Sequence, residues 1–314
     1  MPATELTQEE SQLINRNLAE KVYSRNPSLV KEAEDELSDF TRMRMREEGF
    51  WRKIINVKPV TNKDLDRDPY SDKPRMIFEK EPNSPAAVSL PFANTPSFVY
   101  LKGNRYEVKI QRISTPRFSK DVDELRTWEM DFRQIVSDNS IKDLLAEEDG
   151  VFLRSVNTCL VGPEQIVPYS GVVQHEVISG GITRNSLQDG FKVMPNTPAS
   201  FEVHSVLINH ITIRDVCKLN TIETGEQISS DIMRNGWTLQ DYMGVKWNIT
   251  IKKGLVPTGT MYHFGDPSAL GKAVELEAPT MFIRREYFML EFFSYEMIGH
   301  TIANSSSVAR IDYR

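Results

Sequence analysis

The sequence is poor in the features that mark secreted, membrane and disulfide-bonded proteins. Its 314 residues include only two cysteines, Cys159 and Cys217, in unlike surroundings, so we expect small core residues in a reducing compartment. No stretch approaches the roughly 18 consecutive apolar residues that a membrane-spanning helix needs. The first residues carry no basic region followed by an apolar one, so we expect neither a signal peptide nor a membrane protein.

Basic residues are not in excess either. The 38 lysines and arginines are outnumbered by 44 aspartates and glutamates, which gives a net charge of −6. A protein whose main task is to hold nucleic acid by charge needs the opposite balance, because phosphate contacts dominate such binding. A mildly acidic protein can still face DNA, and weak overall repulsion suits a container better than a DNA-binding module.

Motifs of known catalytic, phosphate and metal sites are also lacking. The sequence has no nucleophile elbow, phosphate-binding glycine loop or paired-cysteine motif, and Gly180-Gly181 is predicted to be a turn. His204 and His210 are six residues apart, a spacing that suits neither one helical face nor a zinc pattern. The run Glu147-Glu148-Asp149 is typical of a solvated helix end. The sequence therefore predicts no catalytic residue, cofactor or metal site.

What the chain does contain begins with an N-terminal arm. Residues 7–48 show two amphipathic patterns separated by Asn26-Pro27, with narrow apolar stripes. The second begins at Ser28, is expected to end at Gly49, and aligns Val30, Ala33, Leu37 and Phe40. Helices with such narrow stripes do not stand alone, so we expect them to dock on the main body or on another chain.

An extended arm and a hairpin are predicted next. Residues 61–91 are rich in proline, which predicts an irregular segment that crosses a surface. The apolar run 98–101, a turn at Gly103-Asn104 and alternation over residues 106–110 then indicate a β-hairpin. An isolated two-stranded hairpin is marginal in water, so we expect this flap to rest on another part of an assembly.

The remainder is mixed α and β. A long helix is predicted from a cap at Ser119 to about Leu160, with a polar break at residues 137–140. Further helices are predicted at 183–193 and, capped by Thr212 with Asp215, at 212–219. Strands are expected at 172–178, 203–208, 245–251 and 260–264, residues 221–244 are loop-like, and an apolar run covers 281–293.

The C-terminal stretch, residues 292–311, carries the most information. A strand-like run passes through Tyr295-Glu296-Met297-Ile298-Gly299 into a polar turn and a short closing strand. It resembles the end of a tailed-phage major capsid protein. The resemblance extends upstream through the segments 252–257, 264–267 and 282–286 (KKGLVP, FGDP and FIRRE) and through the element order from about residue 80 onward.

The resemblance implies an α+β fold of the Hong Kong ninety-seven type, which these proteins share with encapsulins. It would comprise an N-terminal arm with two helices (1–87), an extended hairpin loop (88–118), the spine helix of a peripheral domain (119–165), an axial domain (166–275) and C-terminal strands of the peripheral domain (276–314). Hexamers and pentamers of such a protein form an icosahedral head shell around double-stranded DNA, without sequence-specific binding or a membrane. The implied partners are portal, scaffold and cement proteins, with assembly in the host cytoplasm and a final place in the virion.

Contacts between subunits would then involve the hairpin, the start of the long helix and its acidic run. The candidate residues are Tyr100, Lys102, Arg105, Tyr106, Val108, Lys109, Arg112, Arg117, Glu147 and Glu148. The arginines either bind acidic patches on the next subunit or form a solvated face. Some relatives join a flap lysine covalently to an asparagine, for which Lys102 or Lys109 and Asn304 are available, although surface ion pairs are the simpler interpretation.

Two other functions remain open at this stage. An encapsulin-like nanocompartment would use the same fold but needs a groove for cargo, which the sequence does not reveal. A cytosolic α/β enzyme would need a site that the sequence does not supply.

Overall fold

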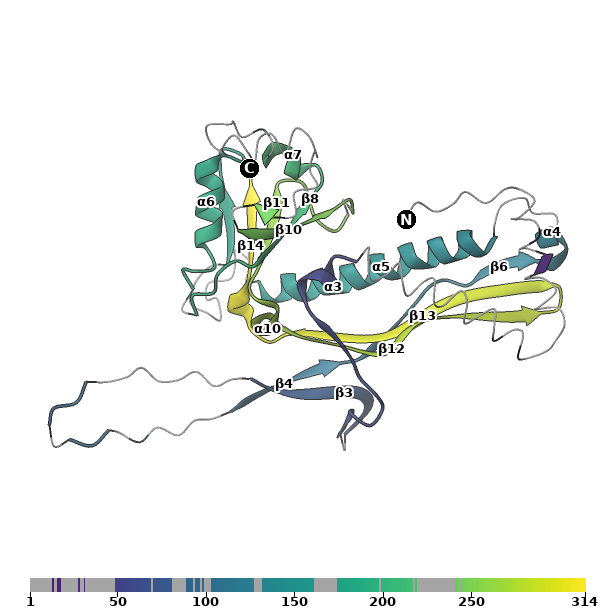
Figure 1. Cartoon of the computed structure of the whole chain (residues 1–314), viewed down its shortest axis with the longest axis horizontal. Helices are drawn as coiled ribbons and strands as arrows, with labels where there is room; N and C mark the ends of the chain where they lie inside the picture. Colours follow the sequence, from purple (N-terminus) through teal and green to yellow (C-terminus); the bar gives the residue numbers. More distant parts are fainter. Residues whose placement is uncertain are drawn as a thin grey trace.

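The computed structural model describes residues 49–314, apart from residues 69, 81–88, 93, 97, 99–102, 127–131, 161–173, 198, 217, 219–240, 243 and 253. Before residue 49 it describes only five isolated residues, so the two helices predicted over residues 7–48 lie outside the described part. The molecule is elongated (Figure 1): a small sheet with its helices stands at one end of a long sheet, and a narrow strand pair projects away from both.

The long sheet contains five strands. They are β1 (Val57–Pro59), β5 (Gln111–Ser114), β6 (Phe118–Asp121), β12 (Gly271–Glu286) and β13 (Met289–Ile302). β12 and β13 form an antiparallel hairpin that runs the length of this sheet, and β5 and β6 pair with the outer edge of β13. At Gly299 the strand passes so close to a neighbour that an added Cβ would lie 2.5 Å from the carbonyl oxygen of Lys109, so glycine is required there.

One helix, α5 (Phe132–Cys159), lies along the long sheet (Figure 1). The predicted break at residues 137–140 is wrong, because the helix is continuous and both Ser137 and Ser140 are fully buried. Serine disfavours a helix interior when its side chain bonds the neighbouring backbone, but two serines packed on the buried face of α5 do not interrupt it. The predicted cap at Ser119 is also wrong: β6 continues to Asp121, whose carboxylate accepts a hydrogen bond from the backbone N–H of Asp123 in α4 (Val122–Arg126).

The six-stranded sheet follows the order β7-β14-β11-β8-β10-β9. The strands are β7 (His175–Ile178), β8 (Ser205–Asn209), β9 (Asp241–Tyr242), β10 (Val245–Thr250), β11 (Thr260–Phe264) and β14 (Val308–Tyr313). The C-terminal strand β14 lies between β7 and β11. The segment predicted to supply the C-terminal strands of the peripheral domain thus contributes to two sheets, because β13 and β14 are separated by the 3-10 helix η1 (Ser305–Ser307).

Helices cover the six-stranded sheet as the sequence indicates. α6 (Arg184–Lys192) begins with a capping box between Thr183 and Ser186, which confirms the helix predicted from residue 183. α7 (Thr212–Val216) is shorter than predicted, and Thr212 does not cap it: its hydroxyl accepts a hydrogen bond from the N–H of Gly259. Two further short helices are α3 (Trp51–Ile54) and α10 (Pro267–Leu270).

The projecting strands differ from the predicted hairpin. β4 (Asn104–Lys109) pairs with β3 (Ser71–Lys80) in the register Met76↔Val108, and β2 (Asp66–Asp68) pairs with the other edge of β3. The first predicted strand, residues 98–101, lies largely outside the described residues, and β4 pairs with β3, which lies in the segment predicted to be an irregular arm. Within β3, half-buried Met76 and Phe78 alternate with exposed Ile77 and Glu79, a period of two that outweighs the nearby prolines.

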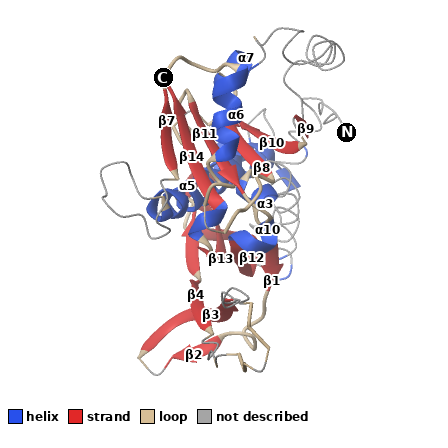
Figure 2. Ribbon diagram, turned by 90° about the vertical axis from the view of Figure 1, so that its left-hand side faces the viewer, coloured by secondary structure: helices blue, strands red, loops and turns tan. Residues whose placement is uncertain are grey.

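A single hydrophobic core connects the two larger sheets. Its largest fully buried members are Trp51 of α3, Phe152 of α5, and Tyr262 and Phe264 of β11. Ile298 of β13 joins the same cluster from the long sheet. Because residues from both sheets and α5 share this core, the small sheet and the long sheet are held to one another by α5. Figure 2 shows α5 above β12 and β13 of the long sheet, with β2, β3 and β4 below them.

Candidate interaction surfaces

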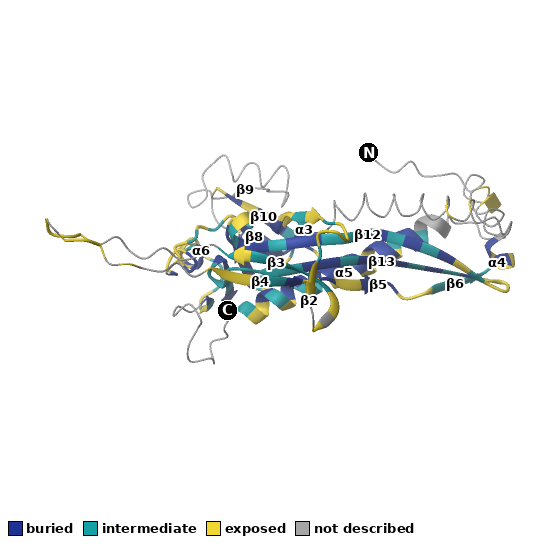
Figure 3. Ribbon diagram, turned by 90° about the horizontal axis from the view of Figure 1, so that it is seen from below, coloured by how far each residue is buried: buried dark blue, intermediate teal, exposed yellow. Residues whose placement is uncertain are grey.

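The projecting hairpin exposes large aromatic side chains. Tyr70, Phe92 and Phe98 are almost fully exposed, at 95%, 105% and 91%, and Leu90 is 43% exposed. They lie before β3 or in the connection between β3 and β4, which is exposed wherever it is described (Figure 3). Single exposed apolar residues are ordinary, but several along one narrow projection are typical of a surface that contacts another molecule.

The base of this hairpin is held by its own chain. Val108 is completely buried together with Ile110 and Val274, and the rings of Tyr106 and Phe78 stack at 5.8 Å. Val108 therefore packs within the subunit, and its prediction as a contact between subunits is corrected. Alternation across a strand directs Val108 inward and its neighbours Glu107 and Lys109 outward.

The charged hairpin residues are exposed and paired locally. Arg105 reaches Glu79 at 3.3 Å across the strand pair, and Lys109 reaches Glu107 at 2.8 Å. Such exposed pairs contribute little to stability, so these side chains can exchange partners when another surface approaches. Tyr100 and Lys102 lie outside the described residues.

One face of the long sheet carries a ladder of aromatic rings. Phe282 stacks with Phe293 at 5.5 Å and with Tyr295 at 5.3 Å, and all three rings are half-buried. The guanidinium groups of Arg112 and Arg117 lie over Tyr295 and Phe293, at 5.2 and 5.9 Å. The intervening residues of both strands, such as Met281 and Phe292, pack on the opposite face. Cation–π contacts hold the two predicted arginines against this open face.

The tip of the β12–β13 hairpin is a surface that the sequence did not reveal. Tyr287, Phe288 and Met289 are 84%, 66% and 39% exposed at the far end of the long sheet. The apolar run over residues 281–293 contains no glycine, proline or asparagine to signal a turn. The turn forms because Tyr287 adopts a left-handed backbone (φ 54°) and its carbonyl accepts a hydrogen bond from Arg285 Nε at 3.1 Å.

The acidic run 147–149 is not a solvated helix end. Glu148 is fully buried and accepts hydrogen bonds from Trp51 Nε1 at 2.8 Å and Arg52 Nη2 at 2.5 Å. Asp149 is also buried and accepts from Lys252 Nζ at 2.5 Å and from the backbone N–H of Trp51 at 3.3 Å. Helical periodicity explains the error, because Glu147 on the neighbouring face is exposed and pairs with Arg154. Glu148 is thus an internal anchor of α3, not a contact between subunits.

Arg52 gathers three carboxylates at this junction. Besides Glu148 it reaches Glu296 at 3.2 Å and Glu275 at 3.4 Å, so α3, α5, β12 and β13 meet around one guanidinium group. Burial, and then the charge of Glu148, raise the pKa of Glu296 to about 10, so its carboxyl group is protonated at neutral pH. Burial likewise raises the pKa of Asp149 to about 6, with Lys252 opposing it, and lowers the pKa of nearby His300 to about 4.

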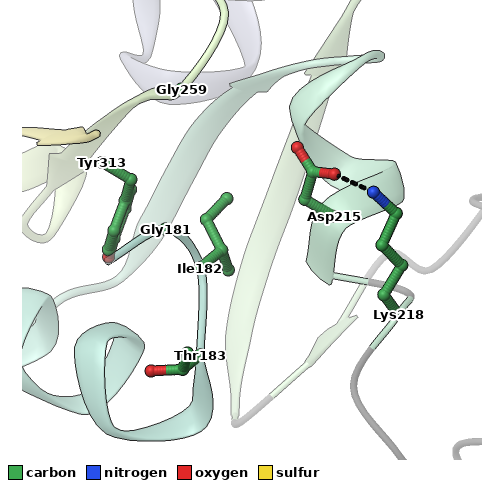
Figure 4. Close-up of a pocket in the computed structure, with 7 residues that line it drawn as sticks. All are labelled: Gly181, Ile182, Thr183, Asp215, Lys218, Gly259 and Tyr313. Carbon is green, nitrogen blue, oxygen red and sulfur yellow. Dashed lines mark hydrogen bonds and ion pairs between the residues drawn. The ribbon is translucent and has the colours of Figure 1, made fainter. Parts of the chain in front are cut away.

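A surface cleft of about 510 Å³ lies at the edge of the six-stranded sheet (Figure 4). Its lining residues are Gly181, Ile182, Thr183, Asp215, Lys218, Gly259 and Tyr313. Three polar side chains of the lining already have partners within the protein. Thr183 caps α6, and Asp215 and Lys218 form an ion pair with each other at 2.6 Å. This cleft therefore presents no pair of nucleophile and base.

Within the described residues, no group of three or more histidine, cysteine, aspartate or glutamate side chains could hold a metal ion. His204 and His210 bracket β8. Cys159 is a free, half-buried thiol at the end of α5, and Cys217 lies outside the described part. The described helices include none with the length and apolar character needed to cross a membrane.

Comparison by sequence finds no match, either to protein-family models or to curated proteins. Comparison by structure finds phage capsids. The chain is similar to the capsid of cyanophage P-SCSP1u (TM-score 0.60, 12% identity, 85% of this chain and 88% of that one) and to the mature capsid of bacteriophage PhiM1 (0.56, 7%, 85% and 87%). It is also similar to a virus-like particle from Pyrococcus furiosus (0.52, 12%, 88% and 98%). The predicted fold is confirmed: the chain has the Hong Kong ninety-seven fold.

Proposed function

We propose that this chain is a major capsid protein of a tailed phage, and that its hexamers and pentamers form an icosahedral shell around double-stranded DNA. The fold supports this, because the three similar structures named above are all shells or virus-like particles. The observation that carries the proposal is the projecting hairpin, whose connection between β3 and β4 exposes Phe92 and Phe98 almost fully. An exposed aromatic projection costs solubility unless a neighbour covers it.

The proposal gives each part of the fold a role in the shell. The long sheet with α5 is the peripheral domain with its spine helix, and the six-stranded sheet is the axial domain around which copies gather. The extended loop is the hairpin of β3 and β4 with the connection between them, and it lies over a neighbouring subunit. The proposed partners of the shell are portal, scaffold and cement proteins, and its place is the virion, after assembly in the host cytoplasm. No catalytic role is proposed.

The test is the particle mass of the untagged chain expressed alone, measured by sedimentation with electron microscopy of the heaviest fraction. Closed shells, tubes or capsomer rings are expected. The double variant Phe92→Asp, Phe98→Asp should remain a folded subunit with an unchanged unfolding midpoint but form no particles. A wild-type chain that stays monomeric or dimeric even with scaffold present would contradict the proposal.

An encapsulin-like compartment is the second candidate. The virus-like particle from Pyrococcus furiosus favours it, because this chain matches 98% of that chain's length. Particle contents decide between the two: a phage shell accepts DNA through a portal, whereas a compartment encloses protein cargo. Particles purified from the native source that contain protein and no DNA would favour the compartment.

A further inference from the structure

A basic groove lies where α3, α5 and the strand β10 meet. It has a volume of about 790 Å³, within the range of binding sites for peptides and small ligands. We name it the lysine groove, and its lining residues are Phe50, Lys53, Lys142, Leu145, Ala146, Lys246, Trp247, Asn248, Ile249, Thr250, Ile251 and Lys252. The charged members are all lysines, although the chain as a whole has net charge −6. The groove is therefore a local exception to the charge balance of the protein.

Three of these lysines are available to an acidic ligand. Lys53, Lys142 and Lys246 are exposed, and none of them makes an ion pair with another described residue. The fourth, Lys252, is already bound to Asp149. Three like charges around one concave surface repel each other, and a ligand that carries carboxylates or phosphates would relieve that repulsion.

A buried hydrogen-bond donor in the lining lacks an acceptor. Asn248 is only 6% exposed, and its Nδ2 amide has no hydrogen-bond partner among the described residues. Leaving such a group unpaired costs about 1–3 kcal/mol, so buried amides almost always find a partner. A ligand oxygen bound in the groove would supply the missing acceptor.

The groove is also apolar, and this separates two kinds of anionic ligand. Phe50, Leu145 and Ile249 line it beside the lysines, and Ile251 leaves 73% of its surface exposed. A nucleic-acid backbone offers phosphates but little apolar surface to cover these side chains. An amphipathic peptide helix with acidic residues satisfies both the lysines and the apolar lining.

The chain itself contains a segment of this kind. Residues 32–39 include five carboxylates and no basic residue, and the helix predicted from Ser28 aligns Val30, Ala33, Leu37 and Phe40 on one side. We propose that the lysine groove of one copy binds residues 28–40 of a second copy, an inference that rests on the proposed shell. The apolar stripe would meet Leu145, Ile249 and Ile251, and the carboxylates would meet the free lysines.

Geometry favours a second copy over the chain's own segment. The predicted helix leads through Gly49 directly to Phe50, which lines the groove. At 1.5 Å per residue, a helix that ends there places Asp39 roughly 15 Å and Glu32 roughly 25 Å from its own Phe50. A helix continuous with Phe50 would hold its carboxylates that far along its axis from the Phe50 end of its own groove, whereas a neighbouring copy can present them to the groove directly.

Zero-length carbodiimide cross-linking of the full chain, with peptide mass spectrometry, tests this inference. Particles and soluble subunits are both measured, from a mixture of ¹⁵N-labelled and unlabelled copies, so that cross-links between copies are separated from those within one. We expect Lys53 to be joined to carboxylates of residues 32–39 in mixed-label pairs. Cross-links only within one copy, or arm carboxylates joined to lysines outside the groove, would overturn the inference.

Charge reversal provides the second measurement. Lys142→Glu with Lys246→Glu should abolish the Lys53 cross-link, and adding Glu32→Lys with Glu36→Lys should restore it. Lys63→Glu, an exposed lysine outside the groove, is the matched control and should leave the cross-link unchanged. Retention of the Lys53 cross-link in the double reversal would contradict the inference.

The outcomes separate this inference from the proposed function. Wild-type particles without the expected cross-link would refute the groove and leave the shell intact. A wild-type chain that forms no particles would refute the shell, while the soluble fraction would still report on the groove. If the groove lysines resist acetylation in DNA-filled particles but not in empty ones, the occupant is DNA and the proposed segment is wrong.

Discussion

The six-stranded sheet and the projecting hairpin bury their apolar residues in different ways. β8 and β11 are buried along their whole length, because α6 and α7 cover one face of the sheet and α5 packs on the other. β4 has a single fully buried residue, Val108, and the connection beyond it carries exposed phenylalanines. The sheet buries its apolar residues within one subunit, whereas under the proposed function the hairpin buries its own against a second subunit. Burial within the subunit therefore separates residues that stabilise the fold from residues that build the assembly.

The largest difference in stability is expected when a phenylalanine is replaced by alanine in each of the two regions. Phe152→Ala removes a fully buried ring that packs against Trp51 and Phe264, and should lower the free energy of unfolding by about 3–5 kcal/mol. Phe98→Ala changes an exposed ring and should lower it by less than about 0.5 kcal/mol. Urea unfolding of the dissociated subunit measures both. Similar losses in the two variants would break the distinction between the regions.

Substitution of two adjacent glutamates, one buried and one exposed, should give a similarly large difference in the free energy of unfolding. Glu148→Ala leaves the guanidinium group of Arg52 buried without its closest partner and should cost about 3–5 kcal/mol. Glu147→Ala removes an exposed pair with Arg154 and should cost less than about 1 kcal/mol. Thermal and urea unfolding of both variants would check this. A mild Glu148→Ala variant would show that the carboxylates around Arg52 do not anchor α3.

The protonated carboxyl group of Glu296 should make the free energy of unfolding depend on pH. The pKa of Glu296 is raised to about 10 in the folded state, so its contribution is complete at acid pH and is lost as the pH rises toward 10. Above pH 7, where His300 and Asp149 no longer titrate, unfolding free energy should fall by at most about 1.4 kcal/mol per pH unit. Glu296→Gln should flatten this fall. An equally steep fall in that variant would assign it to another group.

The smallest effect on the subunit is expected at the β12–β13 tip. Tyr287→Ser with Phe288→Ser changes two exposed side chains and should leave the unfolding midpoint of the dissociated subunit nearly unchanged. If the tip contacts another subunit, the assembled particles should dissociate at lower denaturant concentration, as followed by light scattering. Unchanged particle stability would remove the tip from the assembly surfaces.

The sequence predicted the parts that follow from local patterns. The helix beginning near Thr183 and the strand over residues 260–264 were predicted from caps and apolar runs, and the strand predicted over residues 203–208 is β8. The order of elements pointed to the fold. The pairing of strands was harder to predict. β3 and β4 are separated by a connection of 23 residues, and nothing in the sequence of either strand indicates which strand it pairs with. β3 was missed because the prediction used the proline content of the whole segment 61–91. That average conceals the alternation of exposed and half-buried residues within the ten residues of β3.

The candidate contact residues show a further limit. Glu147 and Glu148 are neighbours in the sequence, yet one is exposed and the other is fully buried beneath Arg52. A charge run does not reveal which helical face it occupies until the partner of that face is known. The exposed tip at Tyr287 was missed for a related reason, since its turn uses residues that are ordinary in strands.

Hydrogen–deuterium exchange of assembled particles and dissociated subunits would test the central claim most directly. Amides of residues 89–98 should exchange rapidly in subunits and become protected in particles, while those of β8 and β11 should be protected in both. That result would show that the hairpin is completed by a neighbouring copy. Equal exchange of the hairpin in both states would contradict the account.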